Sequence, residues 1–314
     1  MIPNVLLPAT SGKGGVGKST LLAHVAGLAA AGGWHVLAVD CDRSGDLATN
    51  LGYQSRSDGG LNLADAVCNN VALTPLTAVR ERLDVVPGGV HLDRVEAHLT
   101  QLALSGAFHQ GALQAVLEPL ASAYDLVVID LPPTSGLVHT AAYTAARALV
   151  ISTNGDQASI NGLGAVYERY LQVHATTNPS LEVLGVVLNA VDARATTTNR
   201  EIVARITELL HNKVPLFTPA VRYAGSAAID LRQHGLLASE YEAAKAHSTR
   251  SRLADLRSGQ PGARRRFAAN AEAYAADLAS VVDQILAAFV ALDVPVDLTD
   301  RPAPAPPPAP EGAK

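Results

Sequence analysis

Residues 11–20 read Ser-Gly-Lys-Gly-Gly-Val-Gly-Lys-Ser-Thr and contain the spacing G-x-x-x-x-G-K-[ST] of a phosphate-binding loop. Glycines let backbone N–H groups converge on phosphate oxygens, and a helix that starts after them adds unpaired donors. In this interpretation Lys18 reaches the β- and γ-phosphates, the Ser19 hydroxyl binds Mg²⁺, and Thr20 donates to the α-phosphate. The alternative is a glycine-rich turn that merely caps a helix.

The residues on both sides of this loop favour the phosphate-binding interpretation. An apolar run at residues 5–7 precedes it, and an Ala/Leu-rich helical pattern at 21–31 follows it. A strand, a glycine loop and a helix start form the context in which the motif binds phosphate.

Two further apolar runs end in aspartate. Residues 34–40 predict a buried strand that leads into Asp40-Cys41-Asp42, and residues 126–130 predict one that ends at Asp130. Ligands bind at the carboxyl ends of strands in open parallel sheets. We therefore expect Asp130 to orient Mg²⁺, usually through water. The first acidic group could instead simply cap the next turn.

Predicted strands and helices alternate along most of the chain. Further strands are expected at 83–88, 148–153, 181–188 and 214–218, and helices at 61–67, 90–104, 112–121, 160–175 and 200–210. This alternation predicts an α/β fold with a doubly wound, mostly parallel sheet flanked by helices. We expect one domain over residues 1–292, ending in a helix at 267–292. The Pro/Ala-rich residues 293–314 are expected to be a disordered tail.

The composition narrows the classes of function. The chain has 314 residues, 48% of them hydrophobic and 17% charged, and a net charge of −5, which argues against a protein that coats nucleic acid generally. Cys41 and Cys68 lack the paired spacing of a zinc or iron–sulfur site. Neither a signal peptide nor an uncharged apolar run of about 18 residues is recognisable. We expect a cytoplasmic protein without a membrane segment.

Lys13 makes the loop resemble that of a particular family. Residues 13–19, Lys-Gly-Gly-Val-Gly-Lys-Ser, resemble the deviant phosphate loop of the ParA/MinD ATPases, and the chain is most similar to DNA-partitioning ParA proteins. The resemblance implies ATP and Mg²⁺ as cofactors and an ATP-dependent homodimer in which Lys13 contacts the partner's phosphates. The alternative is a solvated loop lysine. The P-loop NTPase fold and slow ATP hydrolysis are implied as well.

The resemblance also assigns roles to other residues. Asp42 matches the family acid that positions the attacking water and supports Mg²⁺, so catalysis is assigned to Lys13, Lys18 and Asp42, and Mg²⁺ to Ser19, Asp42 and Asp130. Where the family commonly continues with Pro-Gln-Gly, this chain has Arg43-Ser44-Gly45. The nucleotide is assigned to Gly12, Lys13, Gly14, Gly15, Val16, Gly17, Lys18, Ser19, Thr20, Asn189 and Pro219.

Asn189 is assigned to the adenine on chemical grounds. An amide at a strand end suits the adenine edge, being both donor and acceptor. The alternative is a simple turn residue.

Basic residues in the second half of the chain predict DNA contacts. Arg194 and Arg222 align with arginines that bind DNA nonspecifically in ParA dimers. Residues 245–266 look like an insertion with a basic cluster, and such clusters favour the phosphate backbone; we assign DNA binding there to Arg250, Arg252, Arg264, Arg265 and Arg266. A surface ion pair for the first two, and a solvated helix face for the cluster, are the alternatives.

These features together predict a DNA-partitioning ATPase. It would bind double-stranded DNA of the nucleoid without reading sequence, and a ParB-like centromere-binding adaptor would stimulate hydrolysis. The alternatives are a MinD-like membrane-cycling ATPase, an ATPase that positions protein cargo, and a biosynthetic P-loop enzyme that phosphorylates a small carboxylate. The terminal helix carries Asp277 and Asp283, which disfavours a basic membrane-binding helix.

Overall fold

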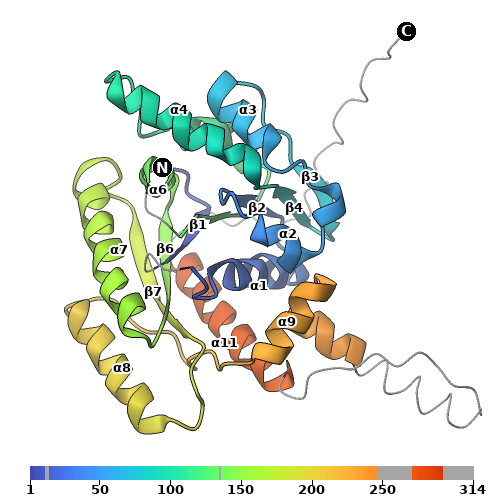
Figure 1. Cartoon of the computed structure of the whole chain (residues 1–314), viewed down its shortest axis with the longest axis vertical. Helices are drawn as coiled ribbons and strands as arrows, with labels where there is room; N and C mark the ends of the chain where they lie inside the picture. Colours follow the sequence, from blue (N-terminus) through green and yellow to red (C-terminus); the bar gives the residue numbers. More distant parts are fainter. Residues whose placement is uncertain (11–13, 134–135, 246–270, 293–314) are drawn as a thin grey trace, which may run out of the picture.

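The computed structural model describes residues 1–10, 14–133, 136–245 and 271–292, with side-chain surroundings for all of these except residues 7–10. Within them, seven strands form one sheet in the order β3-β4-β2-β5-β1-β6-β7 (Figure 1). Paired neighbours are parallel except β3 and β4. The strands are β1 (Val5–Thr10), β2 (Val36–Asp40), β3 (Leu76–Arg80), β4 (Leu83–Val86), β5 (Leu126–Asp130), β6 (Ala148–Asn154) and β7 (Glu182–Asn189).

Side chains of the central strands alternate between two hydrophobic cores. On β5, Val127 and Ile129 enter one core, whereas Leu126 and Val128 enter the other, and all four are fully buried. Successive residues of a strand point to opposite faces, and a parallel sheet is covered on both. The near-continuous apolar runs in the sequence follow from this double burial.

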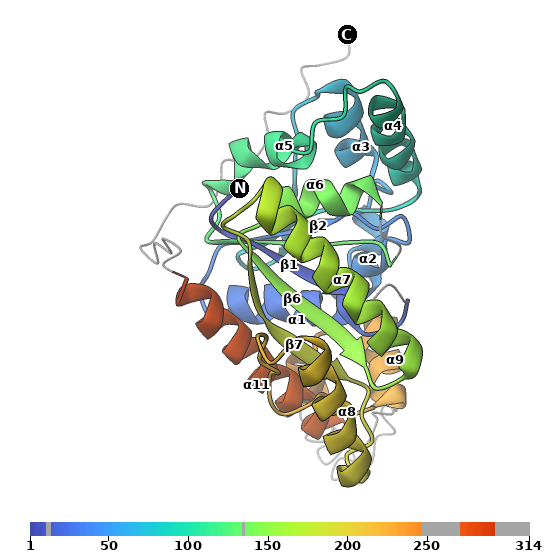
Figure 2. The same cartoon turned by 90° about the vertical axis from the view of Figure 1, so that its left-hand side faces the viewer.

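Helices cover both faces of the sheet (Figures 1 and 2). One core is closed by α3 (Leu61–Asn69), α4 (Asp93–Leu104), α5 (Ala112–Ala121), α6 (Leu137–Ala145), α7 (Gln157–Thr176) and α8 (Thr196–Leu209). The other is closed by α1 (Lys18–Ala31), α2 (Asp46–Leu51), α9 (Gly225–His234), the helical residues 238–245 and α11 (Ala271–Val290). The doubly wound, mostly parallel α/β fold is therefore confirmed.

The terminal helix α11 belongs to the second core. Val281, Val282, Ile285 and Phe289 are fully buried, and the helix contacts α1 and β7. Among the described residues, α11 alone is long and apolar enough to cross a membrane, a test that core helices of soluble proteins also pass. The first four residues of the predicted helix 267–292, the tail 293–314 and the basic segment 246–266 lie outside the described residues.

The predicted strand at 214–218 is not a strand. This part of the chain runs beside β7 and forms isolated parallel bridges, Val186 with Leu216 and Val191 with Arg222. Proline lacks the N–H that a continuous ladder needs, and residues 215 and 219 are both proline. We call residues 214–223 the β7-edge strap. Similarly, the predicted helix 90–104 begins as a short 3₁₀ turn, Val90–Leu92, before α4.

Candidate functional site

The glycine loop joins β1 to α1 at the carboxyl end of the sheet. Gly15 and Gly17 both have a φ of +82°, a backbone conformation that a Cβ disfavours. Gly17 is the N-cap of α1 and offers no side chain to its first turn. The first N–H groups of α1, where the helix dipole is positive, are thus left for an anionic ligand.

A cavity of about 590 Å³ opens at this loop. Its volume lies in the range of about 300–1,000 Å³ that small-molecule sites occupy. The walls come from the loop, the first switch segment (defined here as residues 40–45), α2, the turn after β5 and α9. They are Gly14, Gly15, Val16, Gly17, Lys18, Ser19, Thr20, Asp42, Arg43, Ser44, Asp46, Asn50, Pro132, Pro133 and Arg232.

Lys18 lies at the bottom of this cavity and is buried. Its Nζ donates a short hydrogen bond to Asp130 Oδ1, lies 3.9 Å from Asp42 Oδ2 and 3.4 Å from Ser19 Oγ. A buried ammonium needs a nearby negative charge. The two carboxylates supply it here, and a phosphate group could replace them. The structure thus brings together Lys18, Ser19, Asp42 and Asp130.

The oxygen atoms at this position suit Mg²⁺. Among the described residues, Asp130 Oδ2 is buried and accepts no hydrogen bond, although a buried carboxylate oxygen normally has a partner. Those residues contain no cluster of three or more His, Cys, Asp or Glu side chains that could hold a metal alone. Mg²⁺ commonly uses one or two carboxylates, phosphate oxygens and several waters. A hydroxyl from Ser19 and the carboxylates of Asp42 and Asp130 fit that pattern.

Asp40 holds the first switch segment from inside. Its carboxylate accepts N–H bonds from Asp42 (2.9 Å) and Leu47 (3.3 Å). Burial, followed by the neighbouring charge of Asp130, raises the pKa of Asp40 well above its usual range. Gly88 makes this packing possible, because a Cβ there would lie 2.6 Å from the Asp40 carboxyl carbon. Asp40 therefore positions the segment and does not line the cavity.

Asn189 supports the loop from below. Its Nδ2 donates to the Val16 carbonyl (3.1 Å) and to Ser152 Oγ (2.7 Å), and Ser152 donates to the same carbonyl at 3.0 Å. Asn189 is buried, and a Cβ on Gly17 would lie 3.4 Å from its Cγ. The assignment of Asn189 to adenine stays a prediction. Pro219 lies in the β7-edge strap, alongside the end of β7.

The cavity also contains polar residues that sequence reasoning missed. Thr20 Oγ1 donates to Asn50 Oδ1 at 3.1 Å, and Asn50 Nδ2 donates to the Asp46 carbonyl at 2.8 Å. Arg232 arrives from α9 and pairs with the Asp46 carboxylate. Spacing gave no signal for these residues, because they come from two short helices distant from the loop in sequence.

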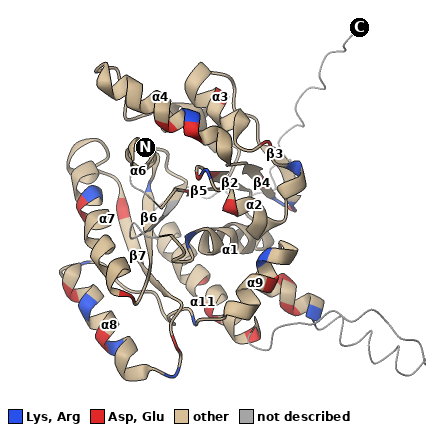
Figure 3. Ribbon diagram, in the orientation of Figure 1, with Lys and Arg blue, Asp and Glu red and all other residues tan. Residues whose placement is uncertain are grey.

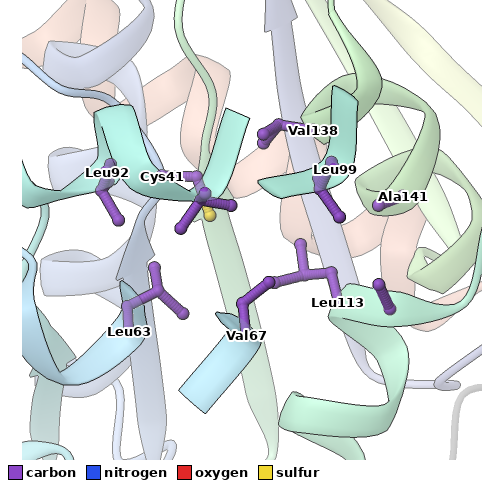
Figure 4. A pocket seen from close by; sticks show the side chains of 10 residues that line it. Cys41, Leu63, Val67, Leu92, Leu99, Leu113, Val138 and Ala141 are labelled. Carbon is purple, nitrogen blue, oxygen red and sulfur yellow. The ribbon is translucent and has the colours of Figure 1, made fainter. Parts of the chain in front are cut away.

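A second, apolar cavity lies behind the first switch segment (Figure 4). Cys41, Leu63, Leu92 and Val138 are among the side chains that line it. Burial raises the pKa of the Cys41 thiol, which disfavours the reactive thiolate. We assign this cavity no chemistry.

Comparison with known proteins identifies the family. Residues 8–183 match the AAA domain family. The chromosome partitioning protein ParA of Caulobacter vibrioides is 31% identical over 194 residues, which are 61% of this chain and 72% of that protein. The chain belongs to the ParA family of P-loop ATPases. Another ParA-family relative, the sporulation initiation inhibitor protein Soj of Bacillus subtilis, is 28% identical over 67% of this chain and 81% of its own.

Solved structures share the fold of this ParA-family chain. McdA from Cyanothece superposes with a TM-score of 0.66 at 21% identity, over 75% of this chain and 92% of that one. Cobyrinic acid a,c-diamide synthase from Mycobacterium smegmatis, with bound ADP and magnesium, gives 0.61 at 26% identity, over 74% and 92%.

Several predicted residues fall outside the described part of this ParA-family chain. For the loop these are Gly12 and Lys13, and for DNA binding they are Arg250, Arg252, Arg264, Arg265 and Arg266. Their assignments stay predictions.

The two described DNA-binding candidates have different surroundings. Arg194 follows β7 and is exposed; its backbone N–H donates to Asp192 Oδ1 at 2.9 Å. Arg222 lies in the β7-edge strap, where its Nε and Nη2 donate to Asp277 of α11 at 2.6 and 2.8 Å. These hydrogen bonds raise the pKa of Arg222. The neighbouring α8 carries both basic and acidic side chains (Figure 3), so that helix does not present a uniformly basic face.

Proposed function

We propose that this protein is an Mg²⁺-dependent ATPase that dimerises when ATP is bound, binds DNA without sequence preference and partitions plasmids or chromosomes. The observation that carries the proposal is the contact of Lys18 with Asp130, close to Asp42, beneath a phosphate loop in a ParA-family chain. The relatives named as chromosome partitioning proteins support the biological role.

The geometry of the site supports the chemical part of the proposal. Lys18 exchanges its carboxylate partners for phosphate oxygens when ATP enters, while the first-turn N–H groups of α1 bind the phosphate chain. Ser19, Asp42 and Asp130 would hold Mg²⁺. When bound, the metal neutralises negative charge on the phosphates. Asp42 positions the attacking water.

The assembly part of the proposal rests on the family resemblance. Lys13 crosses to the partner's phosphates, so ATP occupancy controls whether one subunit or two are present. The dimer joins Arg194, Arg222 and the basic segment into one surface for nucleoid DNA. A ParB-like adaptor stimulates hydrolysis, which separates the subunits and releases the DNA. The protein would therefore act in the cytoplasm, associated with the nucleoid.

Two other functions have particular support. The similarity to cobyrinic acid a,c-diamide synthase favours a biosynthetic P-loop enzyme, which would turn over ATP with a small substrate and without DNA. A MinD-like or cargo-positioning ATPase would use the same ATP site. The apolar face of α11 is buried against α1 and β7, which leaves it unavailable to a membrane surface in this conformation.

A DNA gel-shift with ATP, with ADP and without nucleotide tests the proposal. We expect retention of DNA with ATP and a large loss with the other two. Lys13→Ala should abolish the ATP-dependent shift, whereas Arg94→Ala, which removes one positive charge from an exposed ion pair outside the cavity, should leave it unchanged.

Two outcomes would contradict the proposal. Equal DNA binding in all three nucleotide states would remove the switch. A monomeric mass by light scattering in the presence of a non-hydrolysable ATP analogue would refute ATP-dependent dimerisation. Separately, ATP turnover that depends on a small carboxylate would favour the biosynthetic alternative.

A further inference from the structure

Among the described cations that line the ATP cavity, Lys18 belongs to the loop and Arg43 to the first switch segment, and Arg232 comes from outside both. It belongs to the last turn of α9 and lines the cavity together with the glycine loop. Arg232 lies 212 positions after Thr20, the last residue of the loop motif, so its presence in the cavity depends on how α9 is held against α2.

The contact between α2 and α9 is fixed at their carboxyl ends. Arg80 donates from Nη1 to the Leu51 carbonyl (2.9 Å) and from Nη2 to the Gly235 carbonyl (3.0 Å). The two backbones also touch there, because a Cβ on Gly235 would lie 2.2 Å from the Gly52 Cα. Glycine at both positions therefore lets α9 approach closely enough for Arg232 to reach the cavity.

The ion pair that occupies Arg232 is easily exchanged. Its Nη2 lies 2.8 Å from Asp46 Oδ1, and the two side chains are 47% and 44% exposed. An exposed pair of this kind contributes little to stability. A triphosphate carries more negative charge than the single carboxylate of Asp46, and a phosphate group can accept two parallel hydrogen bonds from a guanidinium where Asp46 accepts one here.

Hydrogen bonds connect Asp46, the ion-pair partner of Arg232, to the glycine loop. Asn50 is buried and joins Thr20 Oγ1 to the backbone of Asp46. Arg232, Asp46 and the loop therefore keep a defined spacing across the cavity mouth.

We propose that Arg232 binds a phosphate oxygen of the bound nucleoside triphosphate and leaves Asp46 to do so. The inference rests on the proposed ATP-binding function and adds a residue to it. Asp46 pairs with the guanidinium when no nucleotide is bound, and it competes with the nucleotide for Arg232.

Titration of fluorescent ATP analogue into the full chain, with Mg²⁺, tests this inference. Arg232→Ala should raise the Kd by about 5- to 20-fold, the loss expected for a partly exposed hydrogen bond between charged groups. Arg232→Lys should recover part of the affinity, since it keeps the charge but not the fork. Asp46→Asn should lower the Kd, because it removes the competing carboxylate.

Arg94→Ala is the matched control. The Arg94–Asp65 pair has an N···O distance of 3.1 Å and side chains that are 46% and 33% exposed, but it does not line the cavity. The Kd of Arg94→Ala for the fluorescent ATP analogue should equal that of the wild type. Lys18→Ala separates the two hypotheses: if the wild type binds and Lys18→Ala does not, the ATP site is supported independently.

The inference about Arg232 is overturned if Arg232→Ala binds ATP as tightly as Arg94→Ala while Lys18→Ala fails to bind. It is also overturned if Asp46→Asn weakens binding as much as Arg232→Ala, since that would make the ion pair itself the required element. Absence of ATP binding by the wild type would instead refute the proposed function.

Discussion

Replacement of Arg222 by alanine should destabilise the protein, because Arg222 connects the β7-edge strap to α11. Asp277 is only 7% exposed and accepts two hydrogen bonds from the Arg222 guanidinium and a third, at 3.1 Å, from its backbone N–H. Without the guanidinium, a buried carboxylate keeps one backbone donor and no cation. The substitution therefore leaves an uncompensated negative charge in the second core.

The size of the effect follows from the exposure of the pair. Breaking a fully buried ion pair costs about 3–5 kcal/mol. The Arg222 side chain is 35% exposed, so water reaches the pair, and we expect a loss of about 2 kcal/mol in the free energy of unfolding. Asp277→Ala should cost less, because the arginine that it leaves can be hydrated.

Urea unfolding followed by circular dichroism measures these differences. The loss of unfolding free energy in the double variant Arg222→Ala/Asp277→Ala should be smaller than the sum of the two single losses, by about 1–3 kcal/mol. Arg194→Ala, at an exposed position assigned to the same DNA, is the control and should unfold like the wild type. If Arg222→Ala weakens DNA binding with no change in unfolding, Arg222 is a DNA contact and the structural argument is wrong.

Three further predictions concern the site and its support. Lys18→Met should abolish ATP binding in an equilibrium titration, because it removes the buried cation of the loop; retention of wild-type affinity would contradict its role. Burial lowers the pKa of His24 to about 4, below the unfolded value, so stability is complete above about pH 6.5 and falls as the pH drops toward 4, by up to roughly 3 kcal/mol. Across that window the dependence of the unfolding free energy on pH should become shallower in His24→Gln, and the remainder comes in part from His139, whose pKa burial also lowers to about 4. An unchanged pH dependence would exclude His24 as a cause. Gly88→Ala should lower both the unfolding midpoint and ATP affinity, because its Cβ would strike the Asp40 carboxylate; a variant with wild-type values would show that Asp40 can move freely.

The loop and the acid-ended strands could be predicted because their signals are local. A strand buried on both faces is a continuous apolar run, and in β2 and β5 that run stops at Asp40 and Asp130. Parallel pairing with Asp40 opposite Asp130 then follows from the shared carboxyl edge of the sheet. The family resemblance added the expected roles, and the comparisons confirmed the family and the fold.

Other elements were missed because long-range contacts determine them. The edge strand β3 is half-buried and irregular, with Ala78 at a φ of +52°, so it lacks a clear alternating pattern. The helix α2 has only six residues, too few for a helical period to be recognised. The partnership of Arg222 with Asp277 spans 55 residues, and sequence offered Arg222 only as a basic side chain. The prolines at 215 and 219 explain why the apolar run at 214–218 forms isolated bridges in the β7-edge strap and not the predicted strand.

The tether beneath the glycine loop has a consequence for ligand capture. Val16 receives hydrogen bonds from Asn189 at the end of β7 and Ser152 in β6, two strands that are fixed by the sheet. This part of the loop is therefore ordered when the chain folds. Nucleotide binding then does not carry the entropic cost of ordering it. Preorganisation of this kind lets the cavity bind a highly hydrated anion without first having to close around it.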